Sequence, residues 1–408
     1  MSALQLKIHT NKKYLLLIIC MYGFFFENYL EINASKAFGY FDEAIALFFL
    51  FVIIRDILIK KKMRHGSTVV CQIVIIITAI ISTAVNKYQP TVNAILDLFA
   101  IIKFPVTILG GLIFYDGFDS KYYSKYIARH LKILTFMLVA MTVLDMRYNL
   151  FPDTYYQFYK HGMKSLRLFY GHPATLSAVC LFLLSLLIVL EGYGIRTKVY
   201  QLALLIIMLL TLRAKIIGTL AIVGILCIVV FHFHRKITIK RLALLTPFAL
   251  IFAWSEIQSY YIDNKQASRL LLTITSFRVA KDNFPFGSGL ATFGSGFSVS
   301  PYSPVYSLYN LSSVWGLSID APQDISDTFW PMILGQLGVI ALVAYVLFVY
   351  SIYKKMQKRA LNRHAYVGCW VLLVYLLVAS TSESAFVNAY GVFYAVLLAL
   401  FMNTKICN

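Results

Sequence analysis

Side chains suited to group transfer gather in, and directly after, one polar stretch, residues 257–326. They are Arg269, Arg278, the glycine-rich run 286–293, Asp324 and Asp327. A guanidinium binds phosphate oxygens through two parallel hydrogen bonds, and a carboxylate can accept a proton from an attacking hydroxyl. These residue types therefore predict a site that binds a phosphate-bearing substrate and removes a proton.

Backbone and aromatic groups of the same stretch suit a large ligand. Gly287 and Gly289 allow the backbone to turn tightly and to approach a ligand closely. Residues 298–319 contain no carboxylate and are rich in Ser, Pro and Tyr, with Tyr302 and Tyr306 among them. Aromatic faces can stack on sugar rings, but aromatic anchors at a membrane surface have the same composition. The sequence leaves both interpretations open.

A helix is predicted within the stretch, over residues 264–282. Its apolar stripe would consist of Leu270, Leu271, Ile274, Phe277 and Val279. We expect such a helix to lie in the membrane interface, with Arg269 and Arg278 at the depth of the headgroups.

Cations also occur in two shorter connections. Arg213 and Lys215 lie in a tight hairpin, where they either snorkel to lipid headgroups or face the pyrophosphate of a lipid-linked substrate. Arg167 lies in an apolar context, so it is expected to form a structural ion pair or a ligand contact. His172 can act as a general base, although a His directly before a Pro is also typical of a helix entry.

The composition places these residues in a membrane protein. The chain has 408 residues, of which 60% are hydrophobic and only 13% are charged, against about 25% charged residues in soluble domains. The net charge of +19 does not indicate nucleic acid, because the basic residues lie in short loops between apolar spans. The outer loops have no Asp-x-Asp pattern, so neither a metal ion nor another cofactor is expected.

About twelve segments are apolar and long enough to cross a bilayer as helices. They are residues 14–30, 41–59, 67–84, 93–115, 130–146, 173–190, 199–212, 216–233, 242–256, 327–350, 366–380 and 387–402. The predicted fold is therefore an all-α polytopic membrane protein with one large loop late in the chain. Lys103 lies near the middle of the fourth span, where a charge usually faces a protein interior or a cavity. Asp97, its nearest acid along the span, lies on a different face.

Lys and Arg concentrate in alternate connections, for example at 60–62 and 235–241, which the positive-inside rule places in the cytoplasm. Both termini are then cytoplasmic, and the large loop faces outward. The predicted organisation is nine helices in residues 1–256, the large outer loop in 257–326, and three helices in 327–408.

Three local features carry a resemblance to a known family. They are an Arg–ten residues–Gly pattern at Arg278 and Gly289, an arginine in the hairpin before the long loop at Arg213, and the opening of the next span at residues 327–330, followed by Gly335 and Gly338. In these features and in its span layout the chain resembles the bacterial O-antigen and capsule polymerases, which are relatives of the O-antigen ligases. The ligases place a His near position 327, where this chain has Asp327.

The resemblance implies a glycosyltransferase of the bacterial cytoplasmic membrane. It would join repeat units carried on undecaprenyl pyrophosphate, without a metal ion, on the outer side of the membrane. Its partners would be lipid-linked glycans and membrane lipids, with a flippase and a chain-length regulator as protein partners and no nucleic acid. Arg278, Arg213 and Arg167 would stabilise the leaving pyrophosphate, and Asp327 or Asp324, with His172 in reserve, would act as the base.

Three other functions stay open at this point. A lipid-linked oligosaccharide flippase also has about twelve spans, but it usually shows two related halves, and none are visible here. An O-antigen ligase would be expected to carry the His that Asp327 replaces. A lipid-carrier glycosyltransferase of another fold would place acids in the first outer loop, and this chain has Glu27 and Glu31 near there.

Overall fold

The computed structural model describes residues 3–61, 64–152, 159–160, 162–238, 267–359 and 362–403, with a few single positions between 239 and 266. This part of the chain is nearly all helical. Its strands are β1 (Tyr159–Lys160) and β2 (Met163–Lys164), a short antiparallel pair. The helices are α1 (Ala3–Asn33), α2 (Phe41–Lys60), α3 (Gly66–Asn86), α4 (Thr91–Phe114), α5 (Ser120–Tyr148), α6 (Pro173–Glu191), α7 (Lys198–Leu210), α8 (Ala214–Cys227), α10 (Ser268–Asp282), α11 (Pro304–Leu308), α12 (Phe329–Lys358), α13 (Arg363–Ala379) and α14 (Ala389–Asn403).

Within the described residues, eight helices are long and apolar enough to cross a membrane, and α7, α13 and α14 are shorter apolar helices. A helix therefore occupies every predicted span except 242–256, of which the structure describes only two single positions. Many large apolar side chains on these helices are exposed, among them Leu58 (72%), Val85 (70%) and Val199 (78%). An apolar surface of this extent is suited to lipid and not to water.

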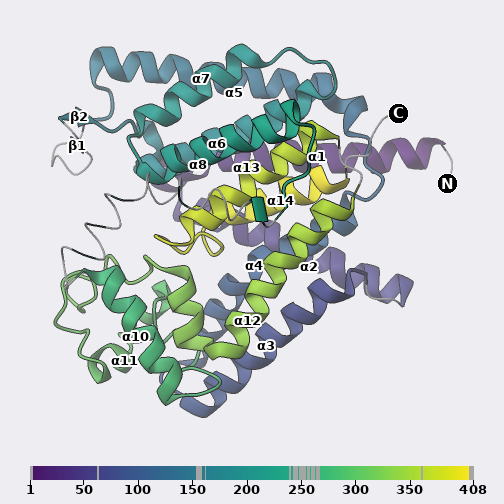
Figure 1. The fold of residues 1–408 in the computed structure, drawn as a ribbon. Coiled ribbons are helices and arrows are strands. Elements are labelled where there is room, and N and C mark those ends of the chain that lie inside the picture. Colours follow the sequence, from purple (N-terminus) through teal and green to yellow (C-terminus); the bar gives the residue numbers. More distant parts are fainter. Residues whose placement is uncertain are drawn as a thin grey trace.

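The centre of the molecule is α14. Its side chains are buried from Tyr390 to Met402, and it packs against α4, α13, α2 and α6 (Figure 1). Small residues allow close approach of these helices: a Cβ added at Gly111 of α4 would lie 2.7 Å from the Ala399 Cβ of α14. The innermost helices thus approach one another closely, whereas α1 and α2 are the least buried of the eight long apolar helices.

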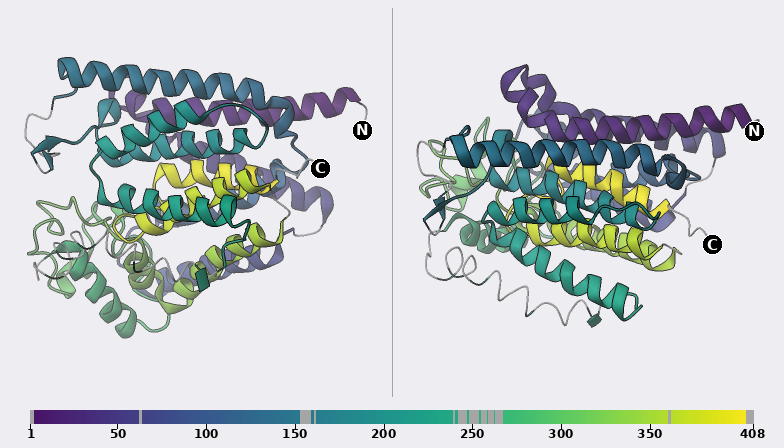
Figure 2. Two further views of the ribbon diagram at one scale, coloured as in Figure 1. Left: turned by 45° about the horizontal axis from the view of Figure 1, so that its top comes forward. Right: turned by 90° about the horizontal axis from the view of Figure 1, so that it is seen from above.

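The connections fall at two ends of the bundle. At one end, which we call the loop end, Gln89 donates to the Pro301 carbonyl and Asn86 to the Gly287 carbonyl. At the other, the basic end, Arg64 pairs with Asp116 at 3.0 Å. Figure 2 shows α10 and α11 at the loop end and both marked termini toward the basic end. The alternation of the predicted connections is therefore present in the fold, whichever compartment each end faces.

Helix α12 is interrupted at Gly338, whose φ of 75° breaks the helical backbone. The long loop supplies the missing hydrogen bonds. The Ser288 and Gly289 amides donate to the Gly335 and Gln336 carbonyls at 2.9 and 2.8 Å, and the Val339 amide donates to the Pro285 carbonyl at 3.2 Å. A broken helix is tolerated at membrane depth when protein groups satisfy its backbone in this way.

The long loop has its own small core, made of Leu272, Val279, Phe293, Val305, Tyr306, Leu311, Leu317 and Ile325. Helix α10 turns Leu272, Thr275, Ser276 and Val279 inward, whereas Ile274 and Phe277 are 44% and 64% exposed. The predicted apolar stripe was therefore wrong in part, because contacts with this core and with α12 choose the buried face. Residues 264–266 of the predicted helix lie outside the described residues.

A buried carboxylate fastens the long loop to the bundle. Asp97 of α4 is 1% exposed and accepts hydrogen bonds from the Ala291 amide and the Ser295 hydroxyl, both at 2.6 Å. Lys103 faces the protein interior, as predicted, but it pairs with Asp42 and Glu43 of α2, the latter at 2.8 Å. The two charged residues of α4 therefore contact different parts of the chain: Asp97 the long loop, and Lys103 helix α2.

Candidate functional site

Five charged or titratable residues from three connections form one cluster at the loop end. They are Arg167, His172, Arg213, Lys215 and Glu383, and we call them the Glu383 cluster. The connections link α5 to α6, α7 to α8 and α13 to α14, so helix C-termini as well as N-termini lie near the cluster. Dipole ends of both signs meet there, and the positive charge of the cluster comes from its side chains.

His172 begins α6. Its backbone is extended, Pro173 occupies the first helical position, and its Nδ1 accepts a hydrogen bond from the Ala174 amide at 3.1 Å. This is the geometry of a helix N-cap. The structure therefore confirms the helix-entry interpretation of His172, and the same contact fixes the orientation of the ring.

The other ring nitrogen of His172 faces Arg213. The distance from Nε2 to the Arg213 Nη2 is 3.0 Å. Burial and the charges of Arg213 and Lys215 lower the pKa of His172 to about 4, so the ring is neutral at pH 7. A neutral imidazole holds one proton. The nitrogen that holds this proton decides whether the Ala174 amide or the Arg213 guanidinium donates a hydrogen bond to the ring.

Lys215 and Glu383 form an ion pair of 2.7 Å, and the Tyr390 hydroxyl donates to the same carboxylate oxygen at 2.6 Å. Burial alone would raise the pKa of Glu383, but Lys215 and Tyr390 outweigh burial and lower it. Glu383 therefore stays ionised and holds the Lys215 ammonium in place. Sequence reasoning missed Glu383, although it is a lone carboxylate between two apolar spans, at 380–388.

Arg167 holds the connection before α6 together. Its guanidinium donates to the Pro152 carbonyl at 2.7 Å and to the Gly171 carbonyl at 3.2 Å. Its charge also acts on His172. The Glu383 cluster thus contains three cations, one carboxylate and a neutral imidazole, and its net charge is positive.

A second charged pair adjoins the cluster. Arg269 of α10 donates to the Asp327 carboxylate at 2.9 Å. Burial raises the pKa of Asp327, Arg269 opposes the rise, and the nearby Asp324 and Glu383 add to it. The Ser384 hydroxyl also donates to the Ser326 carbonyl at 2.8 Å. Asp327 therefore lies next to the connection that carries Glu383, in the half-buried setting that suits a general base.

Asp324 has a structural neighbour instead. Its carboxylate accepts from the Ser268 hydroxyl at 2.9 Å, and its amide donates to the Gly316 carbonyl at 2.9 Å. These contacts join the start of α10 to the end of the long loop. Of the two predicted carboxylate bases, Asp327 is the one that lies in an ion pair beside the cluster.

Arg278 does not pair with Asp327 in the structure. It is exposed on α10 and makes no hydrogen bond or ion pair with any residue that the structure describes. Nine residues separate it from Arg269, and at about 100° per residue this places the two on opposite faces of the helix. The sequence grouped Arg278 with Asp327, but the structure pairs Asp327 with Arg269.

The predicted glycine and tyrosine ligands are mostly internal. Gly287 and Gly289 are buried with φ of +74° and +103°, and a Cβ at Gly287 would lie 2.6 Å from the Gln336 backbone. Tyr306 is fully buried, with its hydroxyl bonded to the Gly294 amide at 2.9 Å. These three residues therefore pack the loop and offer no surface to a ligand in this conformation. Tyr302 stays partly exposed, and its hydroxyl donates to the Leu317 carbonyl at 2.6 Å.

Neither a scan against protein-family models nor a search of curated proteins gives a match for this chain. Function must therefore be inferred from the chemistry of the cluster and its neighbours.

Proposed function

We propose that this chain is a metal-independent glycosyltransferase that polymerises undecaprenyl-pyrophosphate-linked repeat units into a bacterial surface polysaccharide, an O-antigen or a capsule. The loop end faces the outer side of the cytoplasmic membrane, and both termini face the cytoplasm. The observation that carries the proposal is the convergence of Arg167, Arg213 and Lys215 on His172, next to the carboxylate of Asp327.

The cluster suits the donor substrate because of where its charge lies. A lipid-linked glycan holds its pyrophosphate at headgroup depth. The Glu383 cluster lies between the ends of apolar helices and has a net positive charge. Arg213, Lys215 and the one ring proton of His172 would together bind phosphate oxygens.

The proposed reaction joins two lipid-linked glycans. A hydroxyl of the acceptor glycan attacks C1 of the donor's first sugar, the new glycosidic bond forms, and the bond from C1 to the pyrophosphate oxygen breaks. Undecaprenyl pyrophosphate leaves with both bonding electrons, and its charge is stabilised by Arg213 and Lys215. The hydroxyl proton goes to a carboxylate. Much of the rate would come from holding two large substrates in line.

Asp327 is the base in this proposal. Its raised pKa makes it a stronger base than an ordinary carboxylate, and Arg269 fixes its position. His172, whose pKa is lowered to about 4, is a weak base and serves better as a donor to phosphate. A flippase would deliver the repeat units to the loop end, and a chain-length regulator would act on the growing product.

Transport of a lipid-linked glycan is a second candidate function. Two observations favour it: the interruption of α12 at Gly338, and the buried Lys103 with its partners Asp42 and Glu43. Broken helices and intramembrane charges are typical of transporters. The long loop, however, fills the interruption, and the carboxylates of Asp42 and Glu43 balance the single charge of Lys103.

The length of the surface polysaccharide on a host that lacks this gene distinguishes the two functions. We expect gel electrophoresis to show single repeat units on that host and a full ladder when the wild-type chain is restored. Loss of even the single repeat, with unpolymerised lipid-linked material on the inner face, would indicate a flippase. Accumulation of polymer that stays on the lipid carrier would indicate a ligase.

A further inference from the structure

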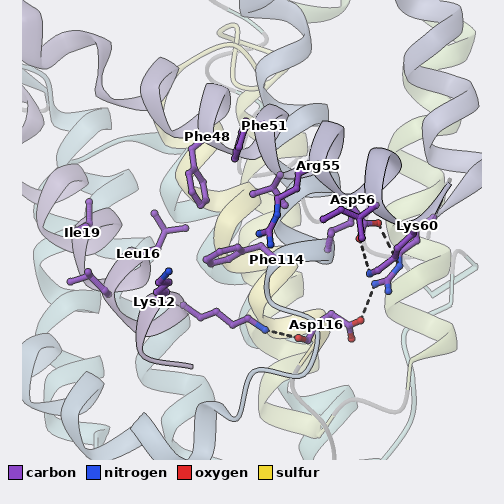
Figure 3. Close-up of a pocket in the computed structure, with 16 residues that line it drawn as sticks. Lys12, Leu16, Ile19, Phe48, Phe51, Arg55, Asp56, Lys60, Phe114 and Asp116 are labelled. Carbon is purple, nitrogen blue, oxygen red and sulfur yellow. Dashed lines mark hydrogen bonds and ion pairs between the residues drawn. The ribbon is translucent and has the colours of Figure 1, made fainter. Parts of the chain in front are cut away.

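A large cavity lies at the basic end, far from the Glu383 cluster. It has a volume of about 980 Å³ and is formed by α1, α2 and the end of α4. Its walls are mainly apolar, and Figure 3 shows side chains from these helices around it, including Leu16, Phe48 and Phe114. Leu15, Ile19 and Phe51 of its lining are also 57%, 41% and 63% exposed. The cavity therefore opens onto the apolar outer surface of the bundle.

The rim of the cavity is strongly basic. Its cations are Lys12, Lys13, Arg55, Lys60 and Arg64, and its acids are Asp56 and Asp116. Five positive charges against two negative ones leave the cavity at +3. A mainly apolar chamber with this rim is complementary to a molecule with an anionic head and apolar chains.

Most of the rim charges are already engaged with one another. Asp56 pairs with Lys60 at 2.6 Å and with Arg64 at 3.6 Å, and Asp116 pairs with Arg64 at 3.0 Å. Lys13 donates to the Asp116 carbonyl at 2.6 Å. The two acids are therefore neutralised within the rim.

Lys12 and Arg55 differ from the other rim cations in their lack of described partners. Neither makes a hydrogen bond or ion pair with any residue that the structure describes. Arg55 lies five residues before the end of α2, which is about 7.5 Å along the helix, and Figure 3 shows its side chain extending toward Phe114. Two cations that have no partner among the described residues thus line this cavity, and long basic side chains near a helix end can extend to the headgroups of a bilayer.

We propose that this cavity binds an anionic phospholipid of the basic-end leaflet. The phosphate lies between Lys12 and Arg55, and an acyl chain follows Leu15, Ile19 and Phe51 toward the membrane interior. The proposal requires that α1, α2 and α4 lie in a bilayer, and it is independent of the reaction proposed for the loop end. Simple snorkelling of the same cations would attract anionic lipids without holding one in the cavity, so filling the cavity would then not release the lipid.

Native mass spectrometry of the purified full-length protein tests the proposal, with phosphatidylglycerol and phosphatidylcholine supplied in equal amounts. We expect wild type to retain one phosphatidylglycerol. The double variant Lys12→Gln/Arg55→Gln should retain it about 30-fold less, since each cation contributes about 1 kcal/mol to binding of an anionic lipid. The matched control is Lys121→Gln/Lys125→Gln, which removes two exposed cations of α5 at the same end but outside the cavity.

Two further variants separate loss of binding from loss of folding. Ile19→Trp fills the cavity without changing its charge and should also release the lipid, whereas Arg55→Lys should keep it. Equal retention of the two lipids by wild type, or equal retention by the double variant and its control, would overturn the proposal. Displacement of the lipid by millimolar inorganic phosphate would identify a site for free phosphate and would also overturn it.

Discussion

At the residue scale, the chemistry depends on which cation meets which carboxylate. The sequence singled out Arg213 and Lys215, in one hairpin, and His172, before a proline, because each is unusual in its local context. Their proximity to Glu383 depends on tertiary contacts, which the spacing of residues along the sequence does not predict. The pairing of Asp327 with Arg269 instead of Arg278 has the same origin, because the orientation of α10 is set by its contacts.

The pH dependence of the reaction tests the role of Asp327. A base works when deprotonated, so the rate should fall as the pH drops through the raised pKa of Asp327. Arg269 holds that pKa down, so Arg269→Gln should raise it further and move the acid limb to higher pH. The measurement is kcat/KM against pH for purified protein acting on lipid-linked repeat units.

The control for this profile is Lys281→Gln, which removes another exposed cation of α10 and should leave the acid limb in place. Asp327→Asn should lower the rate by about 10²–10⁴-fold, the usual contribution of a general base. If the Arg269→Gln limb coincides with that of wild type, Asp327 is not the base.

At the element scale, the local sequence predicts the helices but not the contacts that join one segment to another. Apolar runs of sufficient length predicted a helix for every described span, because burial of backbone in an apolar setting requires helical hydrogen bonds. The interruption of α12 was not predicted. It exists because Gly338 adopts φ of 75° and the distant segment 285–289 fills the broken turn. The glycines 287 and 289 serve this joint.

Replacement of Gly338 by Ala should damage the joint severely. The added Cβ would clash with the Pro285 carbonyl oxygen, at a φ that Ala avoids. We expect a loss of about 3–5 kcal/mol of folding free energy, seen as a large drop in the thermal midpoint of the purified protein. Gly296→Ala is the matched control, because nothing lies within 4 Å of its added Cβ. Equal midpoints for the two variants would contradict this account of the joint.

At the scale of the whole molecule, the fold has two chemically different ends. The basic end carries the cavity at +3, and the loop end carries the long loop and the Glu383 cluster. The sequence predicted this division from the alternation of its charged connections, and the structure gathers the described connections accordingly. The compartment that each end faces stays a prediction from the positive-inside rule.

Cysteine labelling in spheroplasts tests this orientation. In a background without native cysteines, Ser313→Cys should react with a membrane-impermeant maleimide, because Ser313 is exposed at the loop end, which is predicted to face outward. Lys121→Cys, exposed at the basic end, should react only after the membrane is permeabilised. The reverse pattern would place the Glu383 cluster in the cytoplasm and would exclude the proposed reaction.

We infer that the Glu383 cluster stabilises a leaving pyrophosphate. The polymerisation rate of purified Arg213→Gln on lipid-linked repeat units tests this role. We predict a loss of about 10²-fold or more in kcat, because Arg213 would act where charge develops. Arg147→Gln, which removes another exposed arginine of the loop end, should keep a rate near that of wild type. A wild-type rate for Arg213→Gln would contradict the account.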